Sequence, residues 1–465
     1  MKMTLRSRLL SAASLAAASL LCATAAWAQS NFPAGVSPFG PPPQTAITPL
    51  LAGPATVNIG TPSKPSSSVV NPGGSQRANT FLEILGSASG KPQVYGPPYP
   101  GYFFETPASL ACIYSLTPDV PGCNPNDTAL QNVPQSKGSK YIAIVDAYSD
   151  YPEIYTELAA YEAQFGLAAG GYPNTLQVWY TGYGTTNAPG CKSGSYPQPP
   201  SAAGTGWDLE ASLDVEMAHS MAPGATILLV EAQSNSVPDL ACAVLSASAL
   251  IKSYYSSEGE VSNSWGLGEF CTAGPGNCET DWDPIFTKPG LVYFASAGDS
   301  PGTEWPSVSP YLLSAGGTTI RRNGTTGDFI GQSTWTDAGG GPSTIEAKPA
   351  FQKSLVPGFT RGTPDIAFES NPDTGVWIYN TTYEPPYVWW IVGGTSVASP
   401  SLAAIINSAG SFLTSSQAEG TEIYTHTGAW TEITDGYCGV YAQYSAGAPW
   451  NFCTGVGVPK GFADK

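Results

Sequence analysis

The stretch "KYIAIVDAYSDYPEIYTELAAYEAQFG", residues 140–166, combines a short strand with the helix that follows it. The run up to Asp146 is rich in β-branched residues, as expected for a buried strand. A polar segment follows, with Pro152 near the first helical turn and Gly166 at the position of a helix stop. The stretch therefore predicts one strand–helix unit.

The same pattern recurs along the chain. Three more runs have the composition of buried strands, and helical stretches lie among them: "ATILLVEA" (225–232), "GEVSNSW" (259–265) and "GLVYFASAGD" (290–299). Strands that alternate with helices favour parallel pairing. We therefore expect an α/β fold with a mostly parallel central sheet and helices on both faces.

Composition restricts the classes of function. Of the 465 residues only 11% are charged, and acidic residues outnumber basic ones 35 to 18. This balance provides no basic face for nucleic acid. Below about pH 4 most free carboxylates are neutral, so a chain with few basic residues gains little repulsive charge there. The composition thus suits an acidic medium.

The N-terminus is typical of an export signal. Basic residues precede the apolar run 9–21, and Ala26-Trp27-Ala28 forms a small-x-small cleavage site. The run is too short for a membrane anchor. We expect a signal peptide over 1–28, a Pro/Gly/Ser-rich arm or linker over 29–105, and one large α/β domain over 106–465. The protein is then secreted or periplasmic, without a membrane span.

Eight cysteines remain after cleavage, an even number that favours disulfides in an exported chain. Eight cysteines allow 105 connectivities. Pairing neighbours along the sequence predicts Cys112–Cys123, Cys191–Cys242, Cys271–Cys278 and Cys438–Cys453.

The stretch "GGTSVASP" (393–400) places Ser396 at the start of a helix, a setting typical of a nucleophilic serine. In parallel sheets, active-site residues lie beyond the carboxyl ends of strands. Asp146 ends one predicted strand and Asp299 follows another, so both are expected to face the crevice that contains Ser396.

The proton acceptor for Ser396 is less obvious, because the chain contains two histidines, His219 and His426, and neither lies in a catalytic motif. The helix "WDLEASLDVEMAHSMAPG" (207–224) offers Glu210 and Asp214, four residues apart on one face. Spacing alone leaves two interpretations open. The pair is either solvated on the surface, or partly buried and sharing a proton with one pKa raised.

Four motifs in this order resemble the sedolisins, the serine-carboxyl peptidases with a subtilisin-like fold: "EASLDVE" with "APGA", "SAGDS" with "SPYLLSAGGT", "RGTPDIAFESNPDTG", and "GGTSVASP". The resemblance covers roughly Thr106 to Gly461. It implies Ser396 as nucleophile, Glu210 as general base, and Asp214 sharing the proton of Glu210. It also implies Asp299 as a protonated oxyanion donor, with Asp146 and Trp265 behind the catalytic Glu.

The chain departs from this family in two places. Residues 29–105 are too short and too rich in proline for the folded propeptide that sedolisins commonly carry. The family also implies one Ca²⁺, which Glu432, Ile433, Gly447 and Asn451 would bind here. Asn451 lacks the charge of the family's aspartate, and Pro449 restricts the loop. We expect a weakened calcium site, or its replacement by the Cys438–Cys453 bridge.

The sequence thus predicts an acid-acting peptidase that works through an acyl-enzyme, with an optimum between roughly pH 3 and 5. Peptides or denatured proteins are the expected substrates, and a monomer the expected state. Two alternatives stay open: an inactive peptide-binding relative, and a His-dependent subtilisin-type protease.

Overall fold

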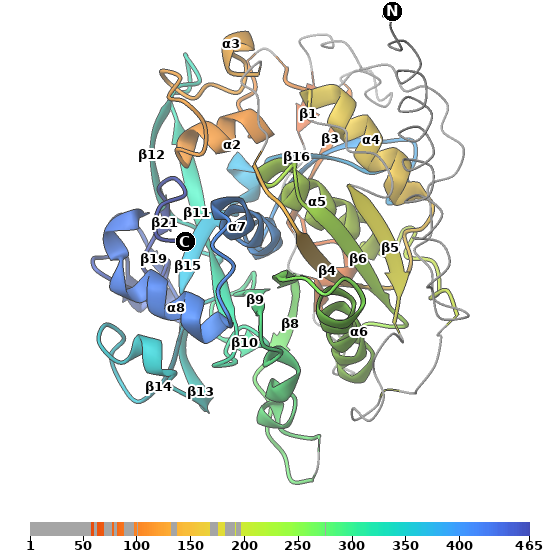
Figure 1. Cartoon of the computed structure of the whole chain (residues 1–465). Helices are drawn as coiled ribbons and strands as arrows, with labels where there is room; N and C mark the ends of the chain where they lie inside the picture. The colour runs from red at the N-terminus through yellow and green to blue at the C-terminus, as the bar shows by residue number, and fades with distance from the viewer. Residues whose placement is uncertain are drawn as a thin grey trace, which may run out of the picture. The chain divides into compact units, whose positions relative to one another are not determined.

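An eight-stranded sheet lies at the centre of the computed structural model (Figure 1). Its strand order is β12-β11-β9-β7-β4-β6-β5, and β15 also pairs with β11. The strands are β4 (Tyr141–Ala147), β5 (Leu176–Tyr180), β6 (Thr226–Ala232), β7 (Gly259–Asn263), β9 (Leu291–Ser296), β11 (Leu313–Arg322), β12 (Phe329–Thr334) and β15 (Ile366–Glu369). The pairs are parallel except β11–β12. The predicted mostly parallel α/β sheet is confirmed.

The structure describes residues 57–59, 63–68, 77–78, 81–87, 97–99, 101–131, 137–167, 175–181, 191, 197–274 and 276–465. They belong to the compact unit 39–465. The predicted signal peptide, 1–28, lies outside these residues, as does most of 29–105. Within the described ranges, no helix is long and apolar enough to cross a membrane.

Helices cover both faces of the sheet. Helices α5 (Trp207–Met221) and α7 (Thr395–Ala409) pack against each other and against the central strands. Their core includes Val292 and Phe294 of β9. Tyr293 points to the opposite face, because side chains alternate along a strand, and its hydroxyl bonds Ser248 of α6 (Val237–Ala249) at 2.8 Å. Helix α6 therefore covers the second face.

The strand–helix unit at 140–166 forms as the sequence predicts. Helix α4 (Glu153–Phe165) begins directly after Pro152 and ends at Gly166. Gly166 has a φ of 64°, in the left-handed region that glycine adopts without strain, and its N–H returns to the carbonyl of Glu162.

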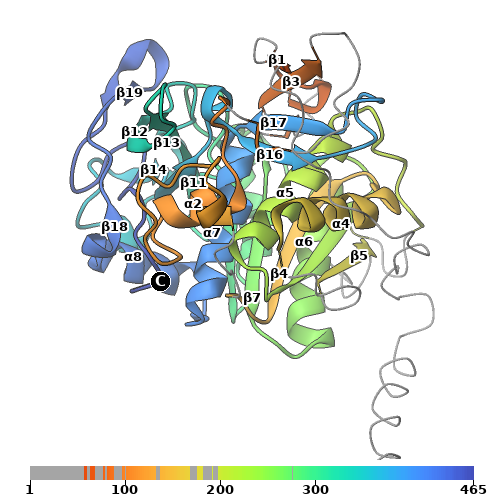
Figure 2. The ribbon, with the colours of Figure 1, turned by 90° about the horizontal axis from the view of Figure 1, so that it is seen from above.

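Two smaller sheets include strands from the segment predicted as an arm. In one, β1 (Val57–Ile59) and β3 (Phe81–Ser87) lie beside β17 (Trp389–Gly393) and β16 (Val376–Tyr379), in the order β1-β3-β17-β16 (Figure 2). In the other, β2 (Arg77–Ala78) pairs with β8 (Trp265–Gly268), which also pairs with β10 (Glu304–Trp305). Strands from 57–87 therefore extend sheets whose other strands come from residues 265–393.

Further elements complete the described chain. They are η1 (Ser66–Ser68), α2 (Pro107–Ile113), α3 (Thr128–Gln131), η2 (Leu250–Tyr254), η3 (Glu279–Asp281), η4 (Asp283–Phe286), β13 (Gly341–Ala347), η5 (Ala350–Gln352), β14 (Thr360–Thr363), η6 (Pro372–Thr374), α8 (Ser416–Thr425), η7 (Thr427–Ala429), β18 (Trp430–Thr431), β19 (Tyr437–Cys438), η8 (Val440–Ala442), β20 (Tyr444–Ser445) and β21 (Val458–Pro459).

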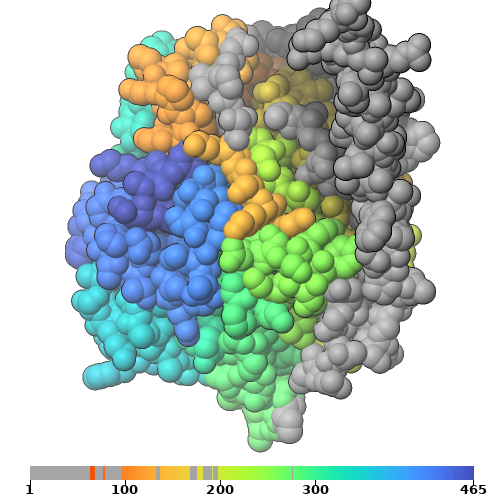
Figure 3. All heavy atoms as spheres, in the orientation of Figure 1, coloured from red at the N-terminus to blue at the C-terminus, as the bar shows by residue number. Residues whose placement is uncertain are grey.

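Helix α2 begins after Thr106, whose side chain caps it. This segment (orange) adjoins the C-terminal residues (dark blue) on the face seen in Figure 3, where Gly461 N–H bonds the carbonyl of Tyr114 at 2.8 Å.

All four predicted disulfides are confirmed. The bridges are Cys112–Cys123, Cys191–Cys242, Cys271–Cys278 and Cys438–Cys453. Three of them close loops of 7 to 15 residues and fix local turns.

Candidate active site

Ser396 lies in the first turn of α7, directly after β17. Gly394 joins the two elements with a φ of 103°, a conformation that side-chain-bearing residues rarely adopt. A Cβ on Gly393 would lie 2.3 Å from the backbone nitrogen of Pro372, so the turn also requires glycine there. The paired glycines thus hold Ser396 at the helix start, where its buried hydroxyl donates to the carbonyl of Ser264 at 3.3 Å.

Helix α5 carries Glu210 and Asp214 toward the interior. Both side chains are fully buried, so the interpretation as a solvated surface pair is wrong. Burial raises the pKa of Glu210 well above its ordinary value, and the neighbouring charges of Asp214 and Asp146 raise it further. The hydroxyl of Ser396 acts in the opposite direction, because it stabilises the charged form of Glu210.

Ser396 and Glu210 are therefore neighbours, but their hydrogen bond is not fully formed. The hydroxyl is directed to Ser264 instead, and among the described residues neither carboxyl oxygen of Glu210 has a partner of good geometry. Rotation about the Cβ–Oγ bond of Ser396 would redirect the proton. Catalytic hydrogen bonds commonly tighten when substrate binds.

Asp214 and Asp146 complete a cluster of buried carboxyl groups. Burial and the charge of Asp146 raise the pKa of Asp214 well above its ordinary value, while a hydrogen bond from Ser264 opposes the shift. Burial also raises the pKa of Asp146, to about 7. Three such groups titrate as a set, so protons remain in the cluster when one of its members becomes charged.

Trp265 positions this cluster from β8. Its indole N–H donates to the carbonyl of Val145 at 3.0 Å, next to Asp146. This bond links β8 to the carboxyl end of β4 and places Trp265 next to Asp146.

Asp299 follows β9 and faces the start of α7. Its Oδ1 accepts hydrogen bonds from the backbone N–H and the hydroxyl of Thr395, at 2.7 and 2.9 Å. Within the described part of the chain, Oδ2 has no partner. Burial raises the pKa of Asp299 to about 6, against the lowering effects of Thr395 and Lys64. Below about pH 6 the group is therefore a neutral acid that can donate.

The structure thus brings the four predicted catalytic side chains together. Glu210 and Asp214 come from α5, Asp299 follows β9, and Ser396 begins α7. Glu210 is within electrostatic reach of Asp214 and Asp299 and contacts the hydroxyl of Ser396.

The two histidines lie elsewhere. His219 is nine residues after Glu210 on α5, which places it on the opposite helix face, and its ring lies 3.1 Å from Glu162. His426 follows α8, is about half exposed, and pairs with Glu422 at 3.0 Å. This arrangement does not favour a His-dependent site at Ser396.

Sequence analysis missed two contributors. Thr395 fixes Asp299, and its hydroxyl also accepts the N–H of Gly298 at 3.0 Å. Ser264 accepts the hydroxyl of Ser396 through its carbonyl, and its own hydroxyl lies near Asp214. Both positions lie inside quoted motifs, but only the fold shows which partner each one bonds.

The C-terminal loop does not fit a calcium ion. The side-chain N–H₂ of Asn451 donates to the carbonyl of Gly447 at 2.9 Å, and Oδ1 accepts from the N–H groups of Cys453 and Thr454 at 2.9 Å. The family resemblance assigns the carbonyl of Gly447 and the side chain of Asn451 to the ion, whereas here they bond each other and Asn451 Oδ1 accepts from two backbone N–H groups. The Cys438–Cys453 bridge also crosses the loop.

Fold and site together define an α/β protein that sets a buried serine hydroxyl among coupled carboxyl groups. No family model matches the chain. Curated proteins with similar sequences include kumamolisin from Bacillus sp. (strain MN-32), 29% identical over 69% of this chain and 58% of kumamolisin. Sedolisin from Pseudomonas sp. (strain 101) is 31% identical over 34% of this chain and 29% of its own length. Xanthomonalisin from Xanthomonas sp. (strain T-22) is 34% identical over 20% of this chain and 13% of its own length.

A solved structure shares the fold. Pseudomonas sedolisin, a serine-carboxyl proteinase complexed with two molecules of pseudo-iodotyrostatin, superposes with a TM-score of 0.57 at 23% identity. The match covers 77% of this chain and 96% of that structure. The chain spans less than two thirds of the length of the curated relatives. The chain is therefore similar in sequence to these peptidases and shares the fold of Pseudomonas sedolisin.

Proposed function

We propose that this chain is an exported serine-carboxyl peptidase that hydrolyses peptide bonds of peptides or denatured proteins in acid. One observation carries the proposal: Ser396 lies beside the buried Glu210–Asp214 pair, with Asp299 held at the adjacent Thr395. The four disulfides support export, because such bridges persist in oxidising compartments.

In the proposed acylation step, Ser396 Oγ attacks the scissile carbonyl while its proton passes to Glu210. Asp299, protonated, donates to the oxyanion. Glu210 then returns the proton to the leaving amine, the C–N bond breaks, and an ester to Ser396 remains.

Water completes the cycle. It attacks the ester carbonyl and gives a proton to Glu210, which passes it to Ser396 Oγ as the C–O bond breaks. Asp214 and Asp146 hold the protons that keep the cluster from carrying three charges. We propose that the protein acts as a monomer and that the loop around Asn451 needs no calcium.

The test is cleavage of a denatured protein from pH 2 to 8 by the wild type and by Ser396→Ala and Glu210→Gln. We expect acid activity that each substitution lowers by at least about 10⁴-fold, because nucleophile and base act as a unit. Ser401→Ala is the matched control: its hydroxyl bonds the carbonyl of Val397 in the same helix, so activity should be kept.

Other outcomes identify the alternatives. No cleavage at any pH, combined with peptide binding, would indicate an inactive relative. Activity near neutral pH that His219→Gln abolishes would indicate a His-dependent protease.

A further inference from the structure

Strand β2 lies along the edge of β8 that leads to the nucleophile. The two strands are antiparallel, with Arg77 opposite Gly266 and Ala78 opposite Trp265. Ser264 directly precedes β8, and its carbonyl accepts the hydroxyl of Ser396. A peptide in the position of β2 therefore runs toward Ser396 with its backbone paired to β8, as in recognition by strand addition.

The side chain of Arg77 reaches across β8 to a buried acid. Its guanidinium lies 2.5 Å from Glu304 on β10, the strand that pairs with the other edge of β8. The side chain of Glu304 is 3% exposed and that of Arg77 13%. This ion pair is therefore shielded from solvent, unlike the exposed pairs that contribute little.

Two glycines make room for this contact. A Cβ on Gly266 would lie 2.3 Å from Oε1 of Glu304, so a larger residue there would collide with the carboxyl group. A Cβ on Gly298 would lie 2.8 Å from Cδ of Glu304, and Gly298 has a φ of 109°. Since Arg77 and Gly266 form a cross-strand pair, their side-chain directions share one face. The missing side chain of Gly266 thus leaves space through which Arg77 reaches Glu304.

We propose that Glu304 is a specificity residue that binds a cationic side chain, arginine or lysine, of the peptide substrate in the place that Arg77 occupies. This proposal rests on the proposed peptidase function. The substrate residue opposite Ser264 is taken as the first residue before the scissile bond. The residue opposite Gly266 is then the third. The cation is therefore recognised at the third residue on the acyl side.

The chemistry of the pocket gives the selectivity. A peptide that displaces β2 removes Arg77 from Glu304, so the buried carboxylate loses this ion-pair partner. A cationic side chain restores the pair, a neutral one does not, and an acidic one adds like-charge repulsion. Lys64, which donates to the backbone carbonyl of Asp299 at 2.7 Å, also lies within electrostatic reach of Glu304.

The experiment uses the full chain and peptides that differ only at the third acyl-side residue: arginine, lysine, norleucine or glutamate. We expect kcat/KM to be about tenfold higher for arginine and lysine than for norleucine, the effect of about 1.4 kcal/mol in the transition state. Glutamate should be the poorest substrate. Equal rates for arginine and norleucine would overturn the proposal.

Variants identify the carboxylate responsible. Glu304→Gln should reduce the arginine-to-norleucine ratio to about one. Glu269→Gln is the matched control, because Glu269 follows β8 directly but accepts from Ser343 and the backbone N–H of Thr344, at 2.8 and 2.9 Å. The Glu269→Gln variant should keep the arginine-to-norleucine ratio of the wild type. If Glu304→Gln does not fold, the wild-type peptide series still decides the question.

Failure of the two proposals can be distinguished. Hydrolysis of all four peptides at similar rates would reject the specificity and leave the peptidase intact. If none is hydrolysed, binding of the labelled arginine and norleucine peptides to the unmodified chain is compared. Arginine preference there would keep the pocket and reject the peptidase, while equal binding would reject both.

Discussion

At the scale of the residue, the protonation state of Asp299 determines whether its side chain can donate a hydrogen bond. Its Oδ1 is fixed by Thr395, whereas its Oδ2 is buried without a partner in the described chain. A carboxyl group donates a hydrogen bond only when it is neutral. Since burial raises the pKa of Asp299 to about 6, the donor is present in acid and is lost as the pH rises through about 6.

Replacing Asp299 by Asn should therefore have a pH-dependent effect. Below about pH 5 the variant should lose about 10²–10³ in kcat, because the amide has a different reach from the acid it replaces. Above about pH 7 the loss should shrink, since wild-type Asp299 is then charged and cannot donate. Rate profiles of both proteins over pH 3–8 measure this difference.

An equal loss at every pH would make Asp299 a structural residue. A fully active variant would remove it from the mechanism.

Glu210 sets the other limit of the pH profile. Its pKa is raised well above the ordinary value by burial and by Asp214 and Asp146, so little of it is charged in strong acid. The raised pKa of Glu210 shifts the expected pH optimum upward from the range of roughly pH 3 to 5 that ordinary carboxyl pKa values predict. We expect activity to peak on the upper side of that range and to fall above about pH 6, where Asp299 ionises.

At the scale of the element, the C-terminal loop is fixed by covalent and hydrogen bonds. Cys438 on β19 is joined to Cys453 across a separation of 15 residues, and Asn451 bonds Gly447 and Thr454 within the same loop. Chelation of calcium should therefore leave the melting temperature unchanged. A clear decrease with chelator, reversed by added Ca²⁺, would contradict the geometry of Asn451.

Removal of the bridge should have a large effect. The double substitution Cys438→Ala with Cys453→Ala should lower the free energy of unfolding by about 3 kcal/mol, the value expected for a loop of this length. Denaturant unfolding measures it. The matched control is Cys271→Ala with Cys278→Ala, whose loop of 7 residues predicts a smaller loss. Equal losses would show that loop length is not the cause.

The elements that sequence predicted best are those with local signals. The strand at 141–147, the helix that ends at Gly166, and the four bridges between neighbouring cysteines follow from short-range patterns. Strands β1 to β3 were missed, because they lie in proline-rich sequence and owe their pairing to distant strands. Glu304 was missed for the same reason: "TEWPSVS" contains no motif, and its role depends on Gly266 and Arg77.

At the scale of the whole molecule, many carboxyl groups are buried. Composition shows 35 acidic residues but not their location. Burial is a property of tertiary structure, and it raises the pKa of groups throughout the fold: Asp146, Asp150, Glu157, Asp208, Glu216, Glu231, Glu260, Glu279, Asp283, Glu346, Glu369 and Glu419.

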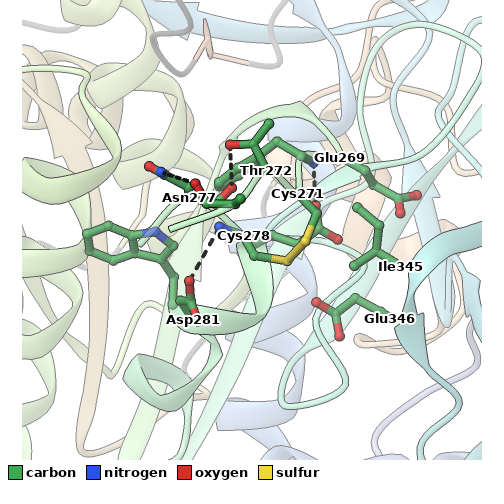
Figure 4. Close-up of a disulfide and its surroundings, with 12 residues drawn as sticks. Glu269, Cys271, Thr272, Asn277, Cys278, Asp281, Ile345 and Glu346 are labelled. Atoms are coloured by element: carbon green, nitrogen blue, oxygen red, sulfur yellow. Dashed lines mark hydrogen bonds between the residues drawn. A yellow bond between two sulfur atoms is a disulfide. The ribbon is translucent and has the colours of Figure 1, made fainter. Parts of the chain in front are cut away.

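One of these clusters lies beside the Cys271–Cys278 bridge, where Figure 4 shows Glu346 facing the disulfide. Burial and the charge of Asp283 raise the pKa of Glu346 to about 9, while burial raises the pKa of Asp283 to about 6. Glu346 as an acid donates to Asp283, and this bond ties β13 to η4. Between about pH 6 and 9 the pair therefore shares one proton.

The buried carboxyls predict a protein that is more stable in acid than at neutral pH. Unfolded carboxyls ionise near pH 4, whereas folded Asp146, Glu231 and Glu346 keep their protons to about pH 7, 8 and 9. From about pH 4 to 9 the folded state binds more protons, so stability decreases as the pH rises, by about 1.4 kcal/mol per pH unit for each additional proton. Thermal unfolding should therefore give a higher melting temperature at pH 5 than at pH 8.

A variant tests the contribution of one group. Glu346→Gln removes one such proton and should make the melting temperature fall less between pH 5 and pH 8, because its amide can donate to Asp283 at every pH. Glu258→Gln is the control: Glu258 is half-exposed, and its bond to Lys140 lowers its pKa, so the decrease should persist. A melting temperature that rises from pH 5 to pH 8 would show that these carboxyls are charged in the folded protein.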